Sequence, residues 1–554
     1  MKKYFYILYI LCMIAGTKVT AQPSPQWIQR FNGLRDSTDV AVDITVDNQG
    51  NSYVTGYSSV LGLLTNIVTI KYNTNGILQW RNDYGTPLCD EGTAIILDNA
   101  QQYVYVTGFV NGLLNLTLAD YVIIKYDVVT GNQVWDKRFN RGLDDRATAI
   151  AVDRQNNPII TGISAALLLD YDYLTVKYDQ GGNVQWSRVY DGFNKRDSAT
   201  GIAVDNNNNV IVTGFSKNGI LLLGGNFDYA TVKYNSAGTQ QWAQRYNGSG
   251  NGDDRSYGIV VDNSNDIIVT GSIRTTTSYD YGTIYYYPNG IQYWVRNYNG
   301  SGNSTDRAYA IVVDNSNNIV VTGESRNPGG TTDYVTVKYQ PNGNTRWSKT
   351  YNGSGNGNDR AYAIDVDNNN NVYVTGEASV SNPGDNTTSP DYGTVKYDEN
   401  GNYQWDATYN GTGNGEDRAY AIDVDNTDQV YISGSSQNSN PTGSEDYTTI
   451  KYPGTNSPVV ITSNSVPLSS NIFQNYPNPF NPETKIKFDV DKNAPVKILI
   501  YDMYGAEISE LFSGRLNPGT YQISWNAKNY PSGAYFYRLL IDGSIITKKM
   551  ILLK

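Results

Sequence analysis

Apolar and polar positions alternate over short runs, and these runs recur in the same order eight times along the chain. One copy consists of residues 241–246, 254–262, 267–271 and 280–286. Each run is rich in Val, Ile, Thr and Tyr, and segments rich in Gly, Asn or Asp separate it from the next. Such runs indicate β-strands joined by turns rather than helices. The pattern therefore predicts four short strands in every copy.

A tryptophan marks the first strand of each copy, at intervals of 51 to 58 residues. These tryptophans are Trp27, Trp80, Trp135, Trp186, Trp242, Trp294, Trp347 and Trp405. After the last copy of the accompanying motif, residues 446–452, no tryptophan follows within the repeat region. Trp27 is unpaired at the other end. A linear stack of repeats has no use for this offset, whereas a ring closes by it.

Four strands in about 50 residues, repeated eight times, are typical of β-propeller blades. A right-handed β-solenoid is the competing architecture. It needs shorter rungs and an apolar ladder at constant spacing, which the sequence lacks. We therefore expect an all-β protein in which residues 22–452 form an eight-bladed β-propeller closed by the N-terminal strand. A seven-fold ring would contradict this prediction.

The two ends of the chain have a different character from the repeats. A basic start, the apolar run of residues 4–16 and the small residues before position 22 predict a secretory signal peptide over residues 1–21. No other stretch is apolar and long enough to cross a bilayer, so we expect no transmembrane span in the mature chain. A polar linker, residues 453–470, precedes a C-terminal segment, residues 471–554.

The C-terminal segment contains five alternating runs separated by Pro- and Gly-containing turns, which predicts a small Ig-like β-sandwich. The segment carries the motif YPNPFNP at residues 476–482, PGTY at 518–521, SGAY at 532–535 and a basic end. In these motifs it resembles the type A C-terminal sorting domain of the type IX secretion system. A plain Ig-like accessory domain is the alternative.

The resemblance implies that the type IX machinery is a partner through residues 471–554. It also implies that the protein is secreted or displayed on the outer-membrane surface of a Gram-negative bacterium.

The hairpin at residues 126–135, which contains a DxxTGxxxW run, indicates the phase of the blades. It resembles the tryptophan-docking turn of quinoprotein-type propellers, where this run leads into the outermost strand of a blade. The whole repeat, roughly residues 27–452, is similar to the SBBP family of bacterial β-propeller repeats. With this phase, each tryptophan strand is outermost and the Asp-containing strand is innermost. Nothing beyond the docking turn matches a quinone site, and we expect no cofactor.

Composition excludes several kinds of chemistry. The chain contains no histidine, which removes histidine-based catalytic triads and histidine-containing zinc motifs. Its two cysteines are Cys12, in the predicted signal peptide, and Cys89, so the mature chain has one thiol. Residues 23–470 carry 29 Lys and Arg against 46 Asp and Glu, without a basic stripe. This balance argues against a nucleic-acid partner.

One acidic position is invariant in all eight copies, at the start of the predicted innermost strand. The residues are Asp39, Asp90, Asp145, Asp197, Asp254, Asp306, Asp359 and Asp417. We expect them at one mouth of the channel, where they would either attract cations or, as the favoured interpretation, cap loop amides and pair with the Arg that follows five of them. A second invariant Asp ends each innermost strand, but it lacks the ligand spacing of a calcium loop and fits an Asx-turn better. We expect no metal site.

Two loops differ between the copies: the loop after the third strand and the loop before the innermost strand. In the first four copies the loop after the third strand is rich in leucine, whereas in the last four it is polar. The leucines are Leu63, Leu64, Leu113, Leu114, Leu167, Leu168, Leu221 and Leu222. In an up-and-down blade this loop and the loop before the innermost strand emerge on the same face, which is called the loop face below. Clustered exposed leucines mark a contact surface; the alternative is a small core in which the loops pack on one another.

These features favour a secreted or cell-surface, non-catalytic protein that binds an extracellular protein or glycan through its loop face. The alternative is a carboxylate-based extracellular glycan-active enzyme. Its candidate residues are the non-repeated acids Asp365, Asp423, Glu324 and Glu377. A purely structural surface-layer component would differ from the first hypothesis only in having no specific partner.

Overall fold

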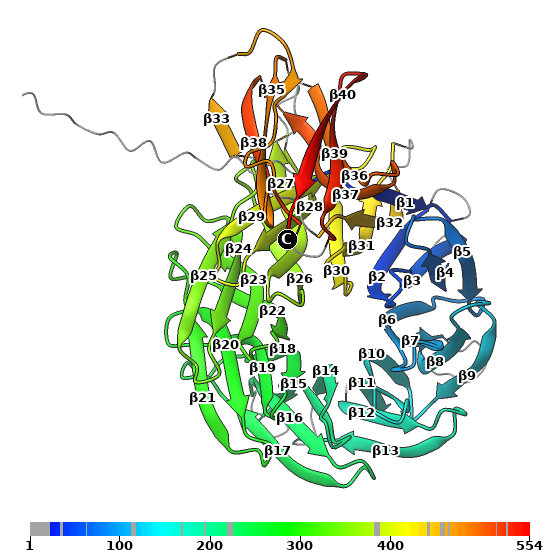
Figure 1. Ribbon diagram of the computed structural model, residues 1–554. Helices are drawn as coiled ribbons and strands as arrows, with labels where there is room; N and C mark the ends of the chain where they lie inside the picture. Colours follow the sequence, from blue (N-terminus) through cyan, green and yellow to red (C-terminus); the bar gives the residue numbers. More distant parts are fainter. Residues whose placement is uncertain are drawn as a thin grey trace, which may run out of the picture. The chain divides into compact units, whose positions relative to one another are not determined.

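Eight four-stranded antiparallel sheets form the unit Pro25–Gly454 in the computed structural model of the protein, and they are arranged around a common axis (Figure 1). In blades 1 to 7 the strands follow one another in sequence from the axis outward. A second compact unit, Thr455–Lys554, is described separately below. The described residues form β-strands, turns and loops without an α-helix. The prediction of an all-β, eight-bladed propeller is confirmed.

The structure describes residues 23–33, 37–61, 64–111, 118–167, 170–192, 196–218, 225–381, 388–439, 444–454, 460–463, 466–492, 494–516, 518–527 and 530–554. Within these ranges, the side chains of residues 61, 167, 460–463, 510 and 513–515 are not described.

The blades are numbered from the first complete one. Blade 1 contains β2 (Asp39–Val46), β3 (Ser52–Leu61), β4 (Leu64–Tyr72) and β5 (Leu78–Tyr84). Blade 2 contains β6 (Glu91–Leu97), β7 (Tyr103–Val110), β8 (Asp120–Asp127) and β9 (Gln133–Phe139). Blade 3 contains β10 (Asp144–Val152), β11 (Pro158–Leu167), β12 (Asp170–Tyr178) and β13 (Val184–Tyr190). Blade 4 contains β14 (Asp197–Val204), β15 (Val210–Lys217), β16 (Phe227–Tyr234) and β17 (Gln240–Tyr246).

The second half of the ring follows the same order. Blade 5 contains β18 (Arg255–Val261), β19 (Ile267–Arg274), β20 (Tyr279–Tyr286) and β21 (Gln292–Tyr298). Blade 6 contains β22 (Asp306–Val313), β23 (Ile319–Arg326), β24 (Thr332–Tyr339) and β25 (Thr345–Tyr351). Blade 7 contains β26 (Arg360–Val366), β27 (Val372–Ser381), β28 (Thr388–Tyr397) and β29 (Tyr403–Tyr409). Blade 8 contains β30 (Asp417–Val424), β31 (Val430–Gln437), β32 (Glu445–Tyr452) and the N-terminal β1 (Trp27–Phe31).

The position of a strand within its blade explains its sequence. In blade 4, β15 and β16 are buried along most of their length, whereas the outermost strand β17 is partly exposed. Middle strands have neighbouring blades on both faces, so they read as nearly continuous apolar runs. A lysine in this buried layer needs a partner: Lys233 Nζ lies 2.8 Å from Asp205 Oδ2, and both side chains are almost inaccessible to solvent.

Every innermost strand contains a β-bulge at the same position, three residues after the invariant Asp. The bulged residues are Val42, Thr93, Thr148, Thr200, Tyr257, Tyr309, Tyr362 and Tyr420. A bulge leaves one residue outside the ladder, bends the strand and turns a side chain in a new direction. The innermost strands therefore present one re-aimed side chain per blade near the start of the strand.

The ring is closed by the two ends of the propeller. Strand β1 pairs antiparallel with β32, with Trp27 opposite Lys451 and Phe31 opposite Tyr447. The innermost strand of blade 8 contacts the innermost strands of blades 7 and 1. Arg30 of β1 also donates through Nη2 to Ser436 Oγ at 2.6 Å. The prediction that the strand around Trp27 completes the last blade is confirmed, and this pairing gives β32, otherwise an edge strand, a partner.

Each outermost tryptophan except the last, Trp405, packs on the turn between the third and fourth strands of the next blade. The indole N–H of Trp186, for example, donates to the Ser236 carbonyl at 3.0 Å. In the same turn Gly238 has a φ of +80°, and a Cβ there would lie 2.7 Å from the Trp186 ring. The equivalent glycines are Gly76, Gly131, Gly182, Gly238, Gly290, Gly343 and Gly401, and each has a positive φ and lies against a tryptophan of the preceding blade. Glycine is thus required twice, for its backbone conformation and for the contact.

Trp405 differs from the other seven. Its outer strand faces blade 8, where β1 arrives from the other end of the chain and no hairpin joins it to β32. Trp405 is buried against Tyr373 and Tyr452. Among the described residues, its indole nitrogen has no acceptor. Because β32 and β1 come from opposite ends of the propeller, blade 8 has no turn between its third and fourth strands, and seven docking turns remain.

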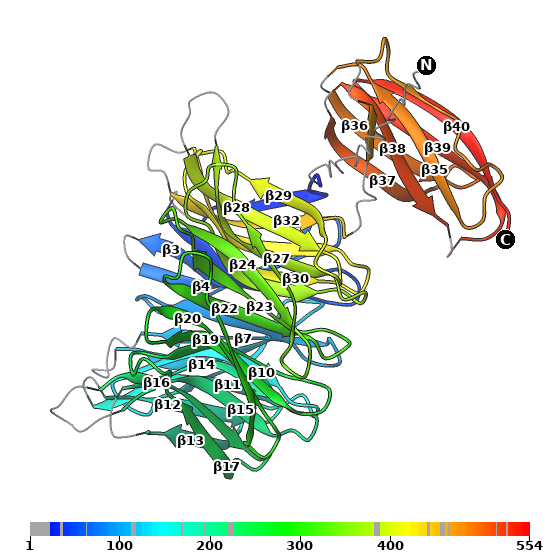
Figure 2. The same ribbon diagram turned by 90° about the vertical axis from the view of Figure 1, so that its left-hand side faces the viewer.

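The second unit is a sandwich of two four-stranded sheets (Figure 2). One sheet has the order β33 (Val460–Ser463), β38 (Gly519–Asn526), β35 (Glu483–Val490) and β34 (Asn471–Ile472). The other has the order β37 (Glu507–Leu516), β36 (Ala494–Tyr501), β39 (Gly533–Ile541) and β40 (Ser544–Leu552). Alternate residues from both sheets, such as Phe488, Trp525, Ile498 and Leu539, share one buried core. Phe480 of the YPNPFNP segment packs on Trp525 with a ring separation of 5.6 Å.

The described part of this unit begins earlier than its expected boundary at residue 471. Residues 453–470 were expected to be a linker, but β33 within this range pairs antiparallel with β38. The sequence VITS is too short to show alternation by itself. Its place in the sheet depends on the backbone groups that β38 offers at its edge.

We expect the docking hydrogen bond to account for a measurable part of propeller stability. Trp186→Phe removes the N–H donor and should lower the free energy of unfolding by about 1–3 kcal/mol. Trp405→Phe is the matched control, because its ring also packs on a tyrosine but its N–H has no described acceptor; its loss should be smaller. Chemical denaturation of the full chain, followed by near-ultraviolet circular dichroism, measures both. Equal losses of unfolding free energy in the two variants would contradict a stabilising role for the docking hydrogen bond.

Candidate functional site

The eight invariant Asp residues at the starts of the innermost strands are buried, each without detectable solvent exposure. In blade 8, Asp417 Oδ2 accepts the Gly411 amide at 2.6 Å and its Oδ1 accepts the Gln437 amide at 2.8 Å. Burial raises the pKa of the carboxyls of Asp254 and Asp359 to about 6 in spite of such bonds. These acids therefore hold the loops of the loop face in place. Carboxylates beyond the reach of solvent do not form the exposed, cation-attracting rim that was the other interpretation.

The invariant Asp residues at the other ends of the innermost strands close Asx-turns. Asp205 Oδ1 accepts the amides of Asn207 and Asn209 at 2.9 and 2.8 Å, and Asn208 between them has a φ of +60°. Asn tolerates this left-handed conformation better than most residues. The Asn-rich runs on this opposite face thus serve the backbone of each blade.

Most of the predicted leucine surface falls outside the described residues. This applies to Leu63, Leu113, Leu114, Leu168, Leu221 and Leu222. Leu64 is described: it begins β4, pairs with Leu61 and is half-buried. Leu167 ends β11, where only its backbone is described. The leucine surface stays a prediction.

The described loop face differs between the two halves of the ring at the bulge position. Blades 5 to 8 carry tyrosines there, and neighbouring rings lie 5.7, 6.1 and 5.9 Å apart in the row Tyr257, Tyr309, Tyr362 and Tyr420. Blades 2 to 4 carry threonines instead. The Thr148 hydroxyl donates to the Ala199 carbonyl of the next blade at 3.0 Å, and Thr200 makes the same bond to Ser256. Both residue types link neighbouring blades, but only the tyrosines add ring surface.

An alternating row of arginines and glutamates accompanies the tyrosines. Arg307 Nη1 and Arg360 Nε lie 2.8 Å from the two carboxylate oxygens of Glu324. Arg360 Nη1 and Arg418 Nε lie 2.5 and 2.7 Å from the two oxygens of Glu377. The arginines are the first or second residues of the innermost strands of blades 6, 7 and 8, and the glutamates belong to the second strands of blades 6 and 7. The row therefore crosses two blade boundaries.

Exposure divides this row by charge. The side chains of Glu324 and Glu377 are 4% and 3% exposed, whereas Arg307, Arg360 and Arg418 are 41%, 39% and 29% exposed. The hydrogen bond that the Tyr309 hydroxyl donates to Glu324 adds to the shielding of the acid. Burial raises the pKa of the Tyr309 hydroxyl, and Glu324 raises it further, so Tyr309 stays protonated. At Arg307 and Arg360, solvent therefore meets guanidinium groups rather than carboxylates, whereas Arg418 also pairs with the exposed Glu416.

A cavity of about 280 Å³ opens at this row, between blades 6 and 7. Its lining includes Arg307, Arg326, Arg360, Glu324, Thr332 and Asn358. Its size is close to the lower end of ordinary ligand sites, and its lining offers charged forks and hydroxyl or amide groups. This cavity and the Tyr and Arg rows form the candidate site, which is called the Arg–Tyr surface below.

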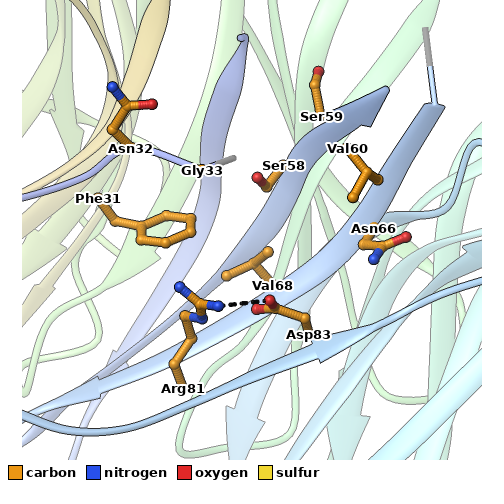
Figure 3. Close-up of a pocket in the computed structure, with 10 residues that line it drawn as sticks. All are labelled: Phe31, Asn32, Gly33, Ser58, Ser59, Val60, Asn66, Val68, Arg81 and Asp83. Atoms are coloured by element: carbon orange, nitrogen blue, oxygen red, sulfur yellow. Dashed lines mark hydrogen bonds and ion pairs between the residues drawn. The ribbon is translucent and has the colours of Figure 1, made fainter. Parts of the chain in front are cut away.

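A smaller cavity of about 90 Å³ lies where the closing strand meets blade 1 (Figure 3). Phe31 of β1 lines it together with Ser58, Val68 and an ion pair between Arg81 and Asp83 at 2.8 Å. The Arg81 guanidinium lies 4.9 Å from the centre of the Phe31 ring. The volume suits a few water molecules rather than a sugar ring. This cavity belongs to the closure of the ring.

Three acids without counterparts in the other blades lie on innermost strands of blades 7, 8 and 1. They are Asp365, Asp423 and Asp43, and each accepts a backbone amide of the following blade at 2.8 to 2.9 Å. Burial raises the pKa of Asp365 to about 7 and that of Asp43 to about 6. Burial together with Asp365 raises the pKa of Asp423 well above its usual value. Each acid thus connects neighbouring blades.

One group of three described carboxylates is close enough to hold a metal ion. Asp172, Asp191 and Asp197 offer oxygens within 4.8 Å of one another in blades 3 and 4. Asp172 already pairs with Arg141 at 2.7 Å, and Asp197 accepts the Gly192 amide at 2.7 Å. The charges of Asp172 and Asp197 are therefore engaged by protein groups.

The tyrosine row is the feature that the sequence analysis missed. Glu324 and Glu377 were considered only as catalytic acids, and the arginines only as partners of the invariant Asp. The signal was available: three residues after that Asp, four copies contain Tyr and the other four contain Thr or Val. Only the bulge reveals that this column faces its neighbours in adjacent blades.

The part of the chain that the structure describes contains no helix long and apolar enough to cross a membrane.

Comparison with known proteins agrees with the two units of the chain. Residues 474–553 match the model of the secretion system C-terminal sorting domain, and residues 26–62 match that of the SBBP beta-propeller repeat. An uncharacterized WD repeat-containing protein of Acanthamoeba polyphaga mimivirus is 32% identical over 122 residues, which is 19% of this chain. The aligned part spans only 9% of the length of that relative.

Solved structures with a similar arrangement share little sequence with the chain. An ulvan lyase is 10% identical, with a TM-score of 0.36, and the match covers 79% of this chain and 95% of the lyase. The polysaccharide lyase Uly1 is 9% identical, with a TM-score of 0.41 and coverages of 77% and 91%. The β-propeller domain of the Trilobed protease from Pyrococcus furiosus is 9% identical, with a TM-score of 0.36 and coverages of 64% and 94%. At these values the likeness carries no argument about activity.

The two family matches, together with the eight blades and the terminal sandwich, identify the chain as a β-propeller protein of SBBP-type repeats whose type IX sorting domain directs it to secretion or attachment at the cell surface.

Proposed function

We propose that the protein is a non-catalytic binding protein that recognises an extracellular protein or glycan through the loop face of its propeller. The observation that carries this proposal is the Arg–Tyr surface. Elsewhere the copies repeat the residues that every blade needs, such as the docking Trp and Gly and the capping Asp. On the loop face of blades 5 to 8 they differ from the first four by adding partly exposed rings, and each of them carries a guanidinium group that in the first four only blade 3 has, in Arg146.

The environment of the acids supports a non-catalytic role. Acid–base work on a glycan needs two carboxyl groups in different environments, one protonated and one ionised. Glu324 and Glu377 are buried beneath arginines that occupy their oxygens. Asp365 and Asp423 accept backbone amides and share similar surroundings on neighbouring blades. Their raised pKa is the one observation that favours the alternative, a carboxylate-based glycan-active enzyme.

We expect the double variant Tyr309→Thr, Tyr362→Thr to lose most of its binding to extracellular material. Threonine is the residue that blades 2 to 4 carry at the same bulge, so the fold should be retained. Sedimentation of the labelled mature chain with a Gram-negative outer-membrane and matrix fraction measures the binding. Tyr287→Thr, Tyr293→Thr is the matched control, since it removes two exposed tyrosines at the turn between β20 and β21. Equal binding by both variants and the parent would refute a role for the tyrosine row.

The leucine loops are tested separately on the same face. Replacing Leu63, Leu114, Leu168 and Leu222 by Ser should abolish binding if these residues form part of the contact surface. The same assay applies, with circular dichroism as the check on folding. Unchanged binding by a folded variant would remove the leucines from the proposal and leave the Arg–Tyr surface as the contact.

We expect no turnover of polysaccharides by the mature chain. Neutral, carboxylated and sulfated polysaccharides are incubated with it, and new reducing ends and unsaturated products are measured. Turnover that Asp365→Asn or Asp423→Asn abolishes would establish the enzymatic alternative. The control variant is Asp83→Asn, at an exposed position. Asp205→Asn is unsuitable because Asp205 pairs with the buried Lys233.

A further inference from the structure

The Arg–Tyr surface is unusual for the charge it offers. The whole chain has a formal net charge of −11, and residues 23–470 carry most of the acidic excess. On the loop face of blades 5 to 8, however, the first or second residue of each innermost strand is an arginine: Arg255, Arg307, Arg360 and Arg418. Arg255 and Arg418 also pair with the partly exposed Asp253 and the exposed Glu416, so Arg307 and Arg360 offer the positive charge of the row. Arg326, at the end of β23, adds a further exposed guanidinium group. A basic row on an acidic protein has a local effect, because interactions between exposed charges more than roughly 8 Å apart are largely screened at physiological salt.

The glutamates of the row fix the positions of the arginines but leave some of their N–H donors available to a ligand. Arg360 uses Nε for Glu324 and Nη1 for Glu377. Arg307 uses Nη1 for Glu324. A guanidinium has five N–H donors in a planar fork, so a contact along one edge leaves donors on the other. Because the glutamates are almost fully buried, the remaining donors are the part exposed to solvent.

The row is also held in place before any ligand arrives. Ion pairs connect Arg307, Glu324, Arg360, Glu377 and Arg418 in one series across three blades. A side chain that is already ordered loses less conformational entropy on binding. The arginines repeat once per blade along innermost strands that contact one another. This arrangement suits a polymer that carries an anionic group at regular intervals better than a single small anion.

Hydroxyl-rich and ring-shaped ligands fit the remainder of the surface. Thr305, Thr332 and Asn358 line the cavity between Arg307 and Arg360 and offer neutral hydrogen-bonding groups. The tyrosine row lies on the same strands, two residues after the arginines, and its rings are partly exposed. Arginine forks recognise carboxylate and sulfate oxygens, while neutral polar groups and aromatic faces suit sugar hydroxyls and ring C–H groups.

We propose that the Arg–Tyr surface binds an acidic polysaccharide, with Arg307 and Arg360 of blades 6 and 7 contacting its carboxylate or sulfate groups and the cavity between these blades receiving a sugar unit. This inference rests on the proposed binding function and names its ligand class.

The decisive variant removes exposed charge without leaving a buried acid unpaired. It combines Arg307→Gln, Glu324→Gln, Arg360→Gln and Glu377→Gln. The formal net charge of the protein stays the same, and glutamine can replace the hydrogen bonds inside the row. The matched control is Arg346→Gln, Glu399→Gln, an ion pair at 2.6 Å between the beginning of β25 and the turn before β29, away from the loop face.

The experiment measures binding of the full mature chain to immobilised dextran sulfate, polygalacturonate and neutral dextran over a range of salt concentrations. The parent and the control should bind one or both acidic polymers, more weakly at high salt, and neutral dextran little or not at all. The quadruple variant should bind at least about tenfold more weakly, and the slope of log affinity against log salt should fall by about two, one for each lost contact. Preference for dextran sulfate identifies sulfate as the group read, and preference for polygalacturonate identifies carboxylate.

Other outcomes overturn the proposal in distinguishable ways. If the quadruple variant binds the acidic polymers as well as the control does, the arginine row is not the site. If poly-glutamate peptide or duplex DNA binds as tightly as the acidic polysaccharides, the surface reads charge alone and the glycan assignment is wrong. If none of these polymers binds but the membrane and matrix fraction still binds through the tyrosines, the ligand class is wrong and the proposed function stands. If that fraction does not bind either, the proposed function itself fails.

Discussion

The docking of an outermost tryptophan on the glycine turn of the next blade is the contact on which the propeller depends. It joins two blades at the rim through one hydrogen bond and one ring-to-backbone contact, and it recurs seven times. Because the ring leaves no room for a Cβ, the turn must contain glycine in a left-handed conformation. This single constraint explains why Trp and Gly keep their spacing in copies that otherwise differ. It also explains the exception: Trp405 faces the blade that the N-terminal strand completes, where the hairpin does not exist.

The inner part of each blade follows a second constraint, the bulge three residues after the buried Asp. The Asp holds the preceding loop through backbone amides, and the bulge turns one side chain away from the ladder. Together they leave one position in each blade at which the fold accepts different residue types. Threonine bonds to the next blade there, and tyrosine contacts the next tyrosine. A propeller can therefore change its loop face at this column without disturbing the packing between sheets.

The Arg and Glu row shows how burial separates the two partners of an ion pair. Exposed ion pairs contribute little to stability because water screens them. Here Glu324 and Glu377 are buried and the guanidinium groups are half-exposed, so the pairs order the arginines and leave the positive charge of Arg307 and Arg360 at the surface. The acids on the innermost strands of blades 7, 8 and 1 have a different role. Their oxygens accept amides across blade boundaries close to the point where the ring closes.

The sequence alone determined the number of blades, the closing strand and the order of strands, because the repeat spacing and the unpaired Trp27 follow from local patterns that every blade must satisfy. It also determined the sorting domain, whose motifs are local. It did not predict β33, since a four-residue strand has too little alternation to stand out and forms only because β38 offers an unpaired edge. For the invariant Asp residues the sequence favoured loop capping over a cation-attracting rim, but their burial could be read only from the loops that cover them. The Arg–Tyr surface needed the tertiary structure most of all: its equivalent arginines and tyrosines lie more than fifty positions apart from one blade to the next, and only the closure of the ring and the bulge in each innermost strand bring them into one row.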